Sequence, residues 1–174
     1  MIRKAVEADI DAIEKIYDAI ITQEEAREHK LIGWVRGIYP TRQTAMDALQ
    51  RGTLFVLEHD GEIVAAAKID QTQVPEYAGA EWEYDAADDE IMVMHTLVVD
   101  PAKGGKGYGR AFVDHYRKYA AENGCRYLRM DTNVKNSRAR SLYASLGFME
   151  AGVVPCTSFN GINGVKLVCL EKKL

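Results

Sequence analysis

A glycine-rich turn between an apolar run and a pattern of helical spacing constrains this chain most. The segment VVDPAKGGKGYGRAFVDHY, residues 98–116, places four glycines within positions 104–109. The run EIMVMHTLVVD before the turn is typical of a strand buried on both faces, and apolar residues recur at helical spacing from Gly107 onward. Because free N–H groups and the helix dipole attract anions at a helix start, the turn predicts a phosphorylated ligand. A flexible turn without a ligand is the alternative.

The segments around this turn predict an α/β fold. A strand at 125–132 follows the helix, and a strand, turn, helix and strand in this order form a right-handed crossover with both strands parallel. Further patterns predict strands at 2–4, 147–154 and 165–173, a hairpin over 53–70 that turns at His59-Asp60-Gly61, and helices that begin at Asp9, Thr41 and Ser137. The 174 residues suffice for one well-cored domain, so we expect a single domain over residues 1–174.

Two common phosphate-binding motifs fail against the glycine turn. A Walker A loop requires G-x-x-x-x-G-K-[ST], but Asp100 stands five residues before Gly105 and Gly107 follows Lys106. A Rossmann fingerprint requires G-x-G-x-x-G in the first βα unit, whereas these glycines lie past the middle of the chain. The pattern therefore disfavours a nucleotide triphosphatase and a dinucleotide enzyme.

Composition excludes several other classes of partner. The net charge is −4 and there is no basic stripe with interleaved aromatic residues, which argues against nucleic acid. No apolar stretch approaches the roughly 20 residues that cross a bilayer, and the N-terminus lacks the apolar core of a signal peptide. We therefore expect a cytoplasmic protein with no membrane partner. The three cysteines lack metal-ligand spacing, so no metal site is expected.

A second motif follows in NVKNSRARSLYASLGF, residues 133–148. Asn136 and Tyr143 stand seven positions apart, close to two helical turns, so both project from one face about 10 Å apart. That separation suits a long, thin ligand. The alternatives are that Asn136 caps the helix and that Tyr143 is a core aromatic residue.

Together, the two motifs resemble the GNAT superfamily of acyl-CoA N-acyltransferases. The family pattern joins a strand ending in V-x-P, a [QR]-x-x-G-x-[GA] turn that opens a helix, and a later N-x-x-A-x-x-x-Y-x-x-x-G-F. The matching residues are Val99, Pro101, Gly107, Gly109, Asn136, Ala139, Tyr143, Gly147 and Phe148. The resemblance implies a mixed central sheet of about six to seven strands flanked by about four helices, with a splayed parallel strand pair.

The resemblance implies acetyl-CoA as co-substrate, lying between the strands at 91–99 and 126–132. The pantetheine amides would pair with the backbone of one strand end, and the pyrophosphate would bind the glycine turn. The cofactor-binding residues implied are Leu97, Val98, Val99, Gly104, Gly105, Lys106, Gly107, Tyr108, Gly109, Arg110, Asn136 and Tyr143. Gly104 departs from the family, which usually has Gln or Arg there. Any side-chain contribution to phosphate binding is therefore expected from Lys103, Lys106 or Arg110.

The implied reaction is direct attack of a primary amine, on a small molecule or a peptide, at the thioester. An alkylammonium with a pKa of about 10.4 is almost wholly protonated at pH 7, so a general base is needed. His95 is the first candidate, because some family members carry a catalytic carboxylate at the matching position, and Glu90 acting through water is the second. A satisfied core histidine is the alternative for His95. The resemblance assigns Tyr143 as general acid to the CoA thiolate.

The resemblance also implies an acceptor pocket built from residues 30–39, 90–95 and 155–164. Trp34 and Tyr39 could wall this pocket, or could pack the loop onto the core. Arg36 could pair with a substrate carboxylate, although an exposed, solvated arginine is commoner. The acidic segment at 81–90 could attract a cationic amine, although any solvated loop has this composition.

Two questions go beyond the motifs. A non-catalytic acyl-CoA-binding or sensor module on the same fold is an alternative to an enzyme, although a sensor needs neither Tyr143 nor a base. Many proteins of this family form homodimers, and the strand at 165–173 offers an edge through which two copies could pair.

Overall fold

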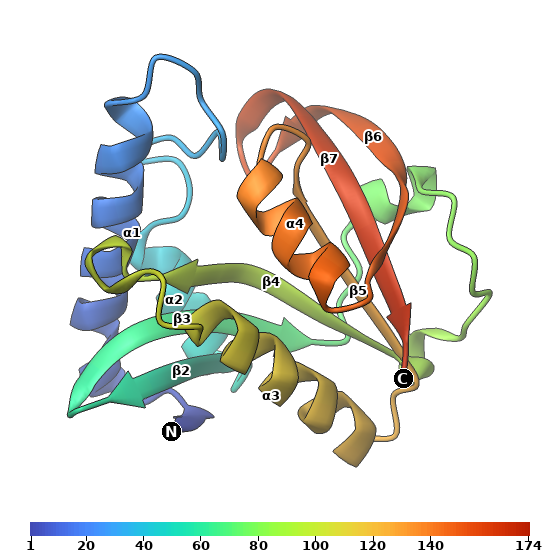
Figure 1. Ribbon diagram of the computed structural model, residues 1–174, viewed down its shortest axis with the longest axis horizontal. Helices are drawn as coiled ribbons and strands as arrows, with labels where there is room; N and C mark the ends of the chain where they lie inside the picture. The colour runs from blue at the N-terminus through green and yellow to red at the C-terminus, as the bar shows by residue number, and fades with distance from the viewer.

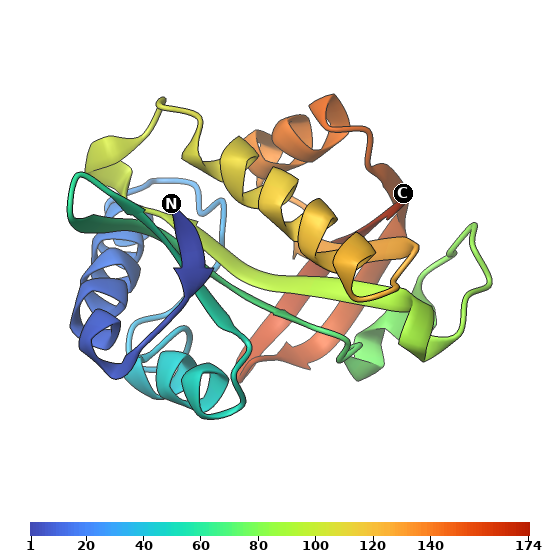
Figure 2. The ribbon, with the colours of Figure 1, turned by 90° about the horizontal axis from the view of Figure 1, so that it is seen from below.

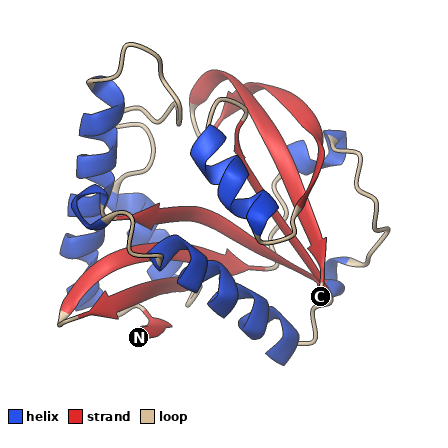
Figure 3. Cartoon of the chain, viewed as in Figure 1, coloured by secondary structure: helices blue, strands red, loops and turns tan.

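The computed structural model describes residues 1–174 and contains one seven-stranded sheet with four α-helices (Figures 1 and 3). The strands are β1 (Ile2–Lys4), β2 (Leu54–His59), β3 (Glu62–Asp70), β4 (Ile91–Val99), β5 (Tyr127–Asn133), β6 (Met149–Phe159) and β7 (Ile162–Lys173). The helices are α1 (Ile10–Glu25), α2 (Arg42–Gln50), α3 (Tyr108–Glu122) and α4 (Ser137–Ser145). The strand and helix numbers confirm the predicted fold. No helix combines the length and the apolar character that crossing a membrane requires.

The sheet runs β1-β2-β3-β4-β5-β7-β6, and β4 with β5 is its one parallel pair. Figure 2 shows α1 and α2 on one side of the sheet and α3 and α4 on the other. Phe112 and Tyr116 of α3 lie in the main core, while Ile13 and Ile16 of α1 lie in a second core on the opposite face. Both faces of β4 are therefore covered, as its apolar sequence predicts.

The parallel pair β4–β5 is paired over only half its length. The register runs from Ile91 opposite Tyr127 to Met94 opposite Met130, and the two strands then separate (Figure 1). Just past this point, Thr96 has a φ of 53°, a left-handed conformation that is rare for a β-branched residue. The register with β3 also shifts there, so a bulge bends β4 away from β5. The splay implied by the family resemblance is confirmed.

The last two strands differ from the prediction in length and position. Both are longer than expected, and they meet at a turn at Asn160-Gly161, so most of residues 155–164 lies in strands rather than in a connection. Strand β7 pairs with β5 on one side and with β6 on the other. The prediction that residues 165–173 form a sheet edge is therefore wrong. The run Leu167–Leu170 is buried on both faces because it belongs to an interior strand.

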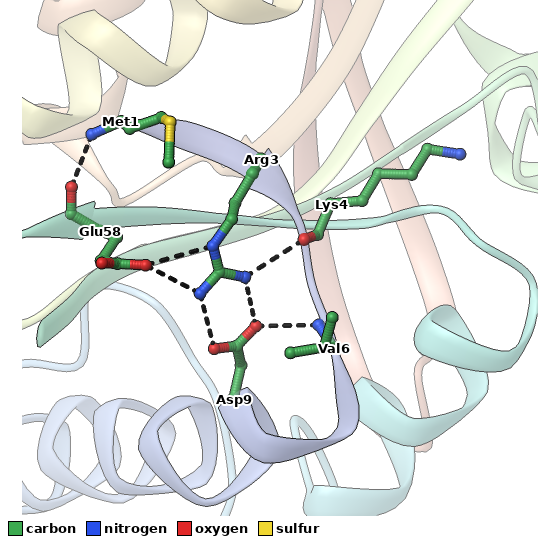
Figure 4. A network of polar contacts seen from close by, with 6 residues as sticks. All are labelled: Met1, Arg3, Lys4, Val6, Asp9 and Glu58. Carbon is green, nitrogen blue, oxygen red and sulfur yellow. Dashed lines mark hydrogen bonds and ion pairs between the residues drawn. The ribbon is translucent and has the colours of Figure 1, made fainter. Parts of the chain in front are cut away.

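The first strand is tied to the first helix by Arg3 (Figure 4). Its guanidinium donates to both carboxylate oxygens of Asp9, at 2.7 and 3.0 Å, and to Glu58 of β2 at 2.9 Å. Helix α1 begins one residue after the predicted start at Asp9, whose carboxylate does not cap the helix and instead accepts from the Val6 N–H at 2.8 Å. The hydrogen bonds from Arg3 lower the pKa of Asp9 below 3.8, against the opposing effect of burial.

We expect Asp9→Asn to lower the free energy of unfolding by about 1.5–3 kcal/mol at pH 7, because charge-assisted hydrogen bonds are lost. The native pKa of Asp9 lies below its unfolded value, so the wild-type advantage is present above about pH 4 and is lost as the pH falls through the native pKa. Urea unfolding at pH 7 and pH 3 measures both effects. Asp11→Asn, which removes an exposed pair with Arg42, is the control and should change little. An equal Asp9→Asn effect at both pH values would contradict this account.

Candidate active site

A cavity of about 910 Å³ opens where β4 and β5 separate. Its walls include the C-terminal half of β4, the glycine turn, α4, the loop between α1 and α2 with parts of those two helices, the end of β5, and the region where β6 and β7 meet. Most of the predicted cofactor-binding and acceptor residues line this one cavity, namely Trp34, Tyr39, His95, Leu97, Val98, Val99, Gly104, Gly105, Lys106, Gly107, Tyr108, Gly109, Arg110, Asn136 and Tyr143. The fold therefore brings residues from distant parts of the sequence into one site.

The glycine turn presents backbone rather than side chains to the cavity. Gly105 and Gly107 have φ values of 81° and 80°, and a Cβ on either would meet no atom within 4 Å. These two glycines are thus required by the left-handed backbone and not by lack of space. Gly107 precedes α3 and no side chain caps the helix start, so the first N–H groups of α3 are free to bind an anion.

The cations around this turn differ from those expected. Lys103 is paired with Glu62, and Arg110 donates to Ser145 Oγ at 3.0 Å. Arg138, in the first turn of α4, places Nη2 3.5 Å from the point where a Cβ on Gly104 would lie, and it makes no ion pair within the protein. Arg138 therefore supplies a cation beside the position where the family usually has Gln or Arg. The sequence gives no sign that Arg138 lies beside Gly104, because the two residues are far apart along the chain.

Asn136 and Tyr143 both line the cavity from α4. The Asn136 side chain accepts from the Ala139 N–H and donates to Thr132 Oγ1, each at 3.2 Å, so the helix-capping interpretation is confirmed. Tyr143 is 7% exposed and belongs to the main core, yet its hydroxyl has no protein partner and is not sealed from solvent. Burial raises the pKa of Tyr143 well above 10, so the phenol keeps its proton at neutral pH.

His95 projects from β4 next to Asp70 of β3. Its Nε2 lies 3.0 Å from the Thr72 carbonyl oxygen and 3.6 Å from Asp70 Oδ1. Because a carbonyl can only accept, Nε2 carries the hydrogen and Nδ1 is left as the basic nitrogen, without a protein partner. Although burial favours the neutral acid, the neighbouring His95, the hydrogen bond from the Thr72 N–H and the charge of Lys68 lower the pKa of Asp70 to about 2. Asp70 is thus a carboxylate that can stabilise a protonated His95.

Glu90 is not brought together with His95 and Tyr143. It lies in a short 3₁₀ turn, Asp88–Glu90, that precedes β4, and it is ion-paired with Arg126. The hydrogen bond from Arg126 lowers the pKa of Glu90. Glu90 does not line the cavity, whereas His95 does.

The loop that carries Trp34 and Tyr39 is anchored by a buried carboxylate. Oε1 of Glu24, which is 2% exposed, accepts from the N–H groups of residues 31, 32 and 33 at 2.7 to 2.8 Å. The Tyr39 hydroxyl bonds that of Thr96 at the β4 bulge, and the Trp34 and Tyr39 rings meet edge to face at 6.0 Å. Glu24 gives no motif in the sequence, because its partners are backbone groups of an irregular loop.

Two other sequence features lie elsewhere. Arg36 is exposed, pairs with Glu25 and Asp18, and does not line the cavity, so the solvated interpretation is confirmed. The acidic segment at 81–90 also stays outside the cavity lining. It is not simply a solvated loop, since Trp82 packs on the core and lies 4.1 Å from the Arg129 guanidinium.

Asp131 was missed by sequence reasoning. It lies near the end of β5, lines the cavity, and accepts a hydrogen bond from the Tyr77 hydroxyl on Oδ2 at 2.8 Å. The one available signal was a carboxylate near the end of a predicted strand. Only the splay, which depends on long-range pairing, turns that carboxylate toward a cavity.

Comparison with known proteins identifies the family. The Acetyltransferase (GNAT) family matches residues 13–148, which is well over half of the chain. An uncharacterized N-acetyltransferase of Methanocaldococcus jannaschii is 26% identical over 153 residues, which cover 88% of this chain and 62% of that protein. The chain thus spans less than two thirds of this relative's length.

Solved structures share the fold at low identity. A GNAT-family acetyltransferase from Streptococcus agalactiae 2603 aligns with a TM-score of 0.79 and 22% identity, covering 100% of this chain and 95% of that one. The protein yncA from Salmonella typhimurium, solved with its cofactor acetyl-CoA, aligns with a TM-score of 0.71 and 20% identity, covering 100% and 93%. The family match establishes that the chain belongs to the acetyltransferase (GNAT) family, as its motifs predict.

We expect Glu24→Ala to loosen the loop at 31–33 without unfolding the sheet. Each charge-assisted hydrogen bond contributes about 1.5–3 kcal/mol, so the amides of these three residues should exchange with deuterium at least about ten-fold faster. Hydrogen exchange read by NMR measures this directly. Glu28→Ala, at an exposed position in the same loop, is the matched control. Unchanged exchange in Glu24→Ala would show that other contacts hold the loop.

Proposed function

We propose that the protein transfers an acetyl group from acetyl-CoA to a primary amine of a small molecule or peptide by direct attack. One observation carries the proposal. A single cavity joins the free N-terminus of α3 to the unpartnered Tyr143 hydroxyl and to His95. An anion site, a proton donor and a proton acceptor in one cavity are what acyl transfer from a phosphorylated thioester to an amine requires.

The cavity offers binding groups for each part of acetyl-CoA. Beyond Met94 the β5 side of β4 has no strand partner, so backbone groups of Leu97, Val98 and Val99 are available to pair with the pantetheine amides. The pyrophosphate is assigned to the N–H groups of the turn at 105–110, with Arg138 beside it. The Asn136 side chain caps α4 and bonds Thr132, which leaves one N–H and one acceptor position of its amide to bind near the pantetheine arm.

His95 is proposed as the general base. When bound, acetyl-CoA supplies an activated thioester, and the acceptor must reach it as a neutral amine. Nδ1 of His95 accepts the ammonium proton, because Nε2–H is held by the Thr72 carbonyl. Asp70, which stays ionised, then stabilises the imidazolium. Glu90 is not carried into this proposal because it is paired with Arg126, outside the cavity lining.

Tyr143 is proposed as the general acid. Its raised pKa keeps the hydroxyl protonated, and the hydroxyl has no protein partner that would compete for its proton. It donates that proton to the CoA thiolate as the carbon–sulfur bond breaks. A sensor module would use neither an unpartnered phenol nor the Asp70–His95 pair, so these groups favour an enzyme.

A panel assay tests the proposal. The purified protein is incubated with acetyl-CoA and with monoamines, polyamines, amino acids, aminoglycosides or peptides, and both thiol release and the acetylated product are measured. The proposal predicts amine-dependent thiol release with a matching amide product. Tight binding of acetyl-CoA in calorimetry without turnover on any amine would instead support a sensor module. Absence of both binding and turnover would exclude either function.

We expect Tyr143→Phe to lower kcat about 100-fold, because the thiolate loses its proton donor, with little change in the Kd for acetyl-CoA. Steady-state kinetics and calorimetry separate the two effects. Tyr119→Phe removes a phenol hydroxyl on α3 that does not line the cavity, and it should leave both values unchanged. A Tyr143→Phe enzyme with wild-type kcat would rule out the general-acid role.

We expect Arg138→Ala to raise the Kd for acetyl-CoA about ten-fold at low salt and less at high salt, with kcat retained at saturation, because a phosphate loses an exposed cation. Arg117→Ala, on the exposed side of α3 away from the cavity, is the matched control. Calorimetric titration at two salt concentrations measures the change. If Lys106→Ala weakens binding and Arg138→Ala does not, then Lys106 rather than Arg138 compensates for Gly104.

A further inference from the structure

Asp131 and His95 occupy equivalent places at the point where the parallel strands separate. Met94 and Met130 form the last pair of the β4–β5 register, and His95 and Asp131 are the next residue on each strand. Because side chains alternate along a strand, both project away from the core face that the two methionines join. Their contacts agree, since His95 bonds the Thr72 carbonyl and Asp131 bonds the Tyr77 hydroxyl in the same connecting segment.

The carboxylate of Asp131 is only partly satisfied by the protein. Oδ2 accepts from the Tyr77 hydroxyl at 2.8 Å, whereas Oδ1 has no protein partner and is not sealed from the cavity that Asp131 lines. A carboxylate has capacity for several donors, so Oδ1 is open to a ligand. Burial raises the pKa of this carboxyl, because the buried carboxylate has lost its hydration. A cation bound to Oδ1 would compensate for that loss.

The wall beside Asp131 is apolar. Cys169 of β7 is its register partner and belongs to the core cluster beneath Tyr77. Four apolar residues that belong to this cluster or pack against it also line the cavity, namely Val74, Phe159, Val165 and Leu167. Ile162, the first residue of β7, lines the cavity as well. An acceptor at this wall would meet one carboxylate within an apolar surface.

We propose that Asp131 Oδ1 binds the ammonium group of the acceptor, so that the amine lies between Asp131 and His95, and that the acceptor is a primary monoamine with an apolar body. This inference rests on the proposed acetyl transfer and adds the substrate class and a residue that determines it. The apolar residues of this wall carry no carboxylate, so a second cationic group held against them would lose its hydration without an ionic partner. Diamines are therefore poorer acceptors than arylalkylamines.

The protons and bonds balance in this arrangement. Of the three ammonium protons, one passes to His95 Nδ1 before attack, and one remains on the nitrogen of the product amide. The third leaves the nitrogen after the carbon–nitrogen bond forms. Tyr143 gives its own proton to the sulfur as the carbon–sulfur bond breaks, and the third ammonium proton restores the Tyr143 hydroxyl. Asp131 takes no proton. Its carboxylate holds the acceptor nitrogen by accepting a hydrogen bond from one of its N–H groups.

The test uses phenethylamine as acceptor and compares wild type with Asp131→Asn. Asn keeps the size of the side chain and can still accept from Tyr77, but it cannot neutralise an ammonium. We expect KM for phenethylamine to rise at least about ten-fold, since a charge-assisted hydrogen bond is lost, while the Kd for acetyl-CoA stays unchanged. Asp114→Asn, on the exposed side of α3, is the matched control. An unchanged KM in Asp131→Asn would overturn the inference.

A measurement on the wild type alone covers the case in which Asp131→Asn does not fold. Phenethylamine should be acetylated with a kcat/KM at least about ten-fold above that of 1,5-diaminopentane, and the uncharged isostere 2-phenylethanol should inhibit only weakly. Equal use of the diamine, or strong inhibition by the alcohol, would overturn the inference and leave acetyl transfer standing. Binding of acetyl-CoA without acetylation of any amine would overturn the proposed transfer, and this inference with it.

Discussion

The separation of β4 from β5 after Met94 and Met130 is the constraint on which the rest of the structure depends. Parallel strands normally satisfy one another's backbone groups, so ending the pairing midway leaves polar groups that need other partners. Strand β7 pairs with the opposite edge of β5 along the whole length of β5. The Tyr116 hydroxyl, within hydrogen-bond distance of the Met92 and Arg129 carbonyl oxygens, supports the end that stays paired. The freed edge of β4 is left for a ligand.

This separation also divides the site between the two faces of the sheet. The glycine turn and α4 lie on the face covered by α3 (Figure 2). His95 and Asp131 project away from that face, and residues of the anchored loop at 31–39 pack on the core under α1. In the proposed reaction, the thioester enters from one face and the amine enters from the opposite face. The bulge at Thr96 joins the two halves, because it bends β4 and its hydroxyl bonds that of Tyr39.

Sequence reasoning succeeded where the signal is local and failed where it depends on strand order. The turn, the start of α3 and the helix Ser137–Ser145 each follow from a few adjacent residues, and the structure confirms them. The interior position of β7 has no local signal, because a buried edge strand and a buried interior strand have the same apolar sequence pattern. Arg138 and Asp131 became candidates only when the fold placed them beside Gly104 and His95. Glu90, near His95 in sequence, lies outside the cavity lining because a strand rises about 3.3 Å per residue.

The crystal structure of the complex with acetyl-CoA tests the central claim most directly. The account predicts pantetheine amides bonded to the backbone of residues 97–99, the pyrophosphate on the N–H groups of the turn at 105–110, and the sulfur within hydrogen-bond reach of the Tyr143 hydroxyl. A complex with acetyl-CoA bound outside the separation of β4 and β5, or with its sulfur remote from Tyr143, would contradict it.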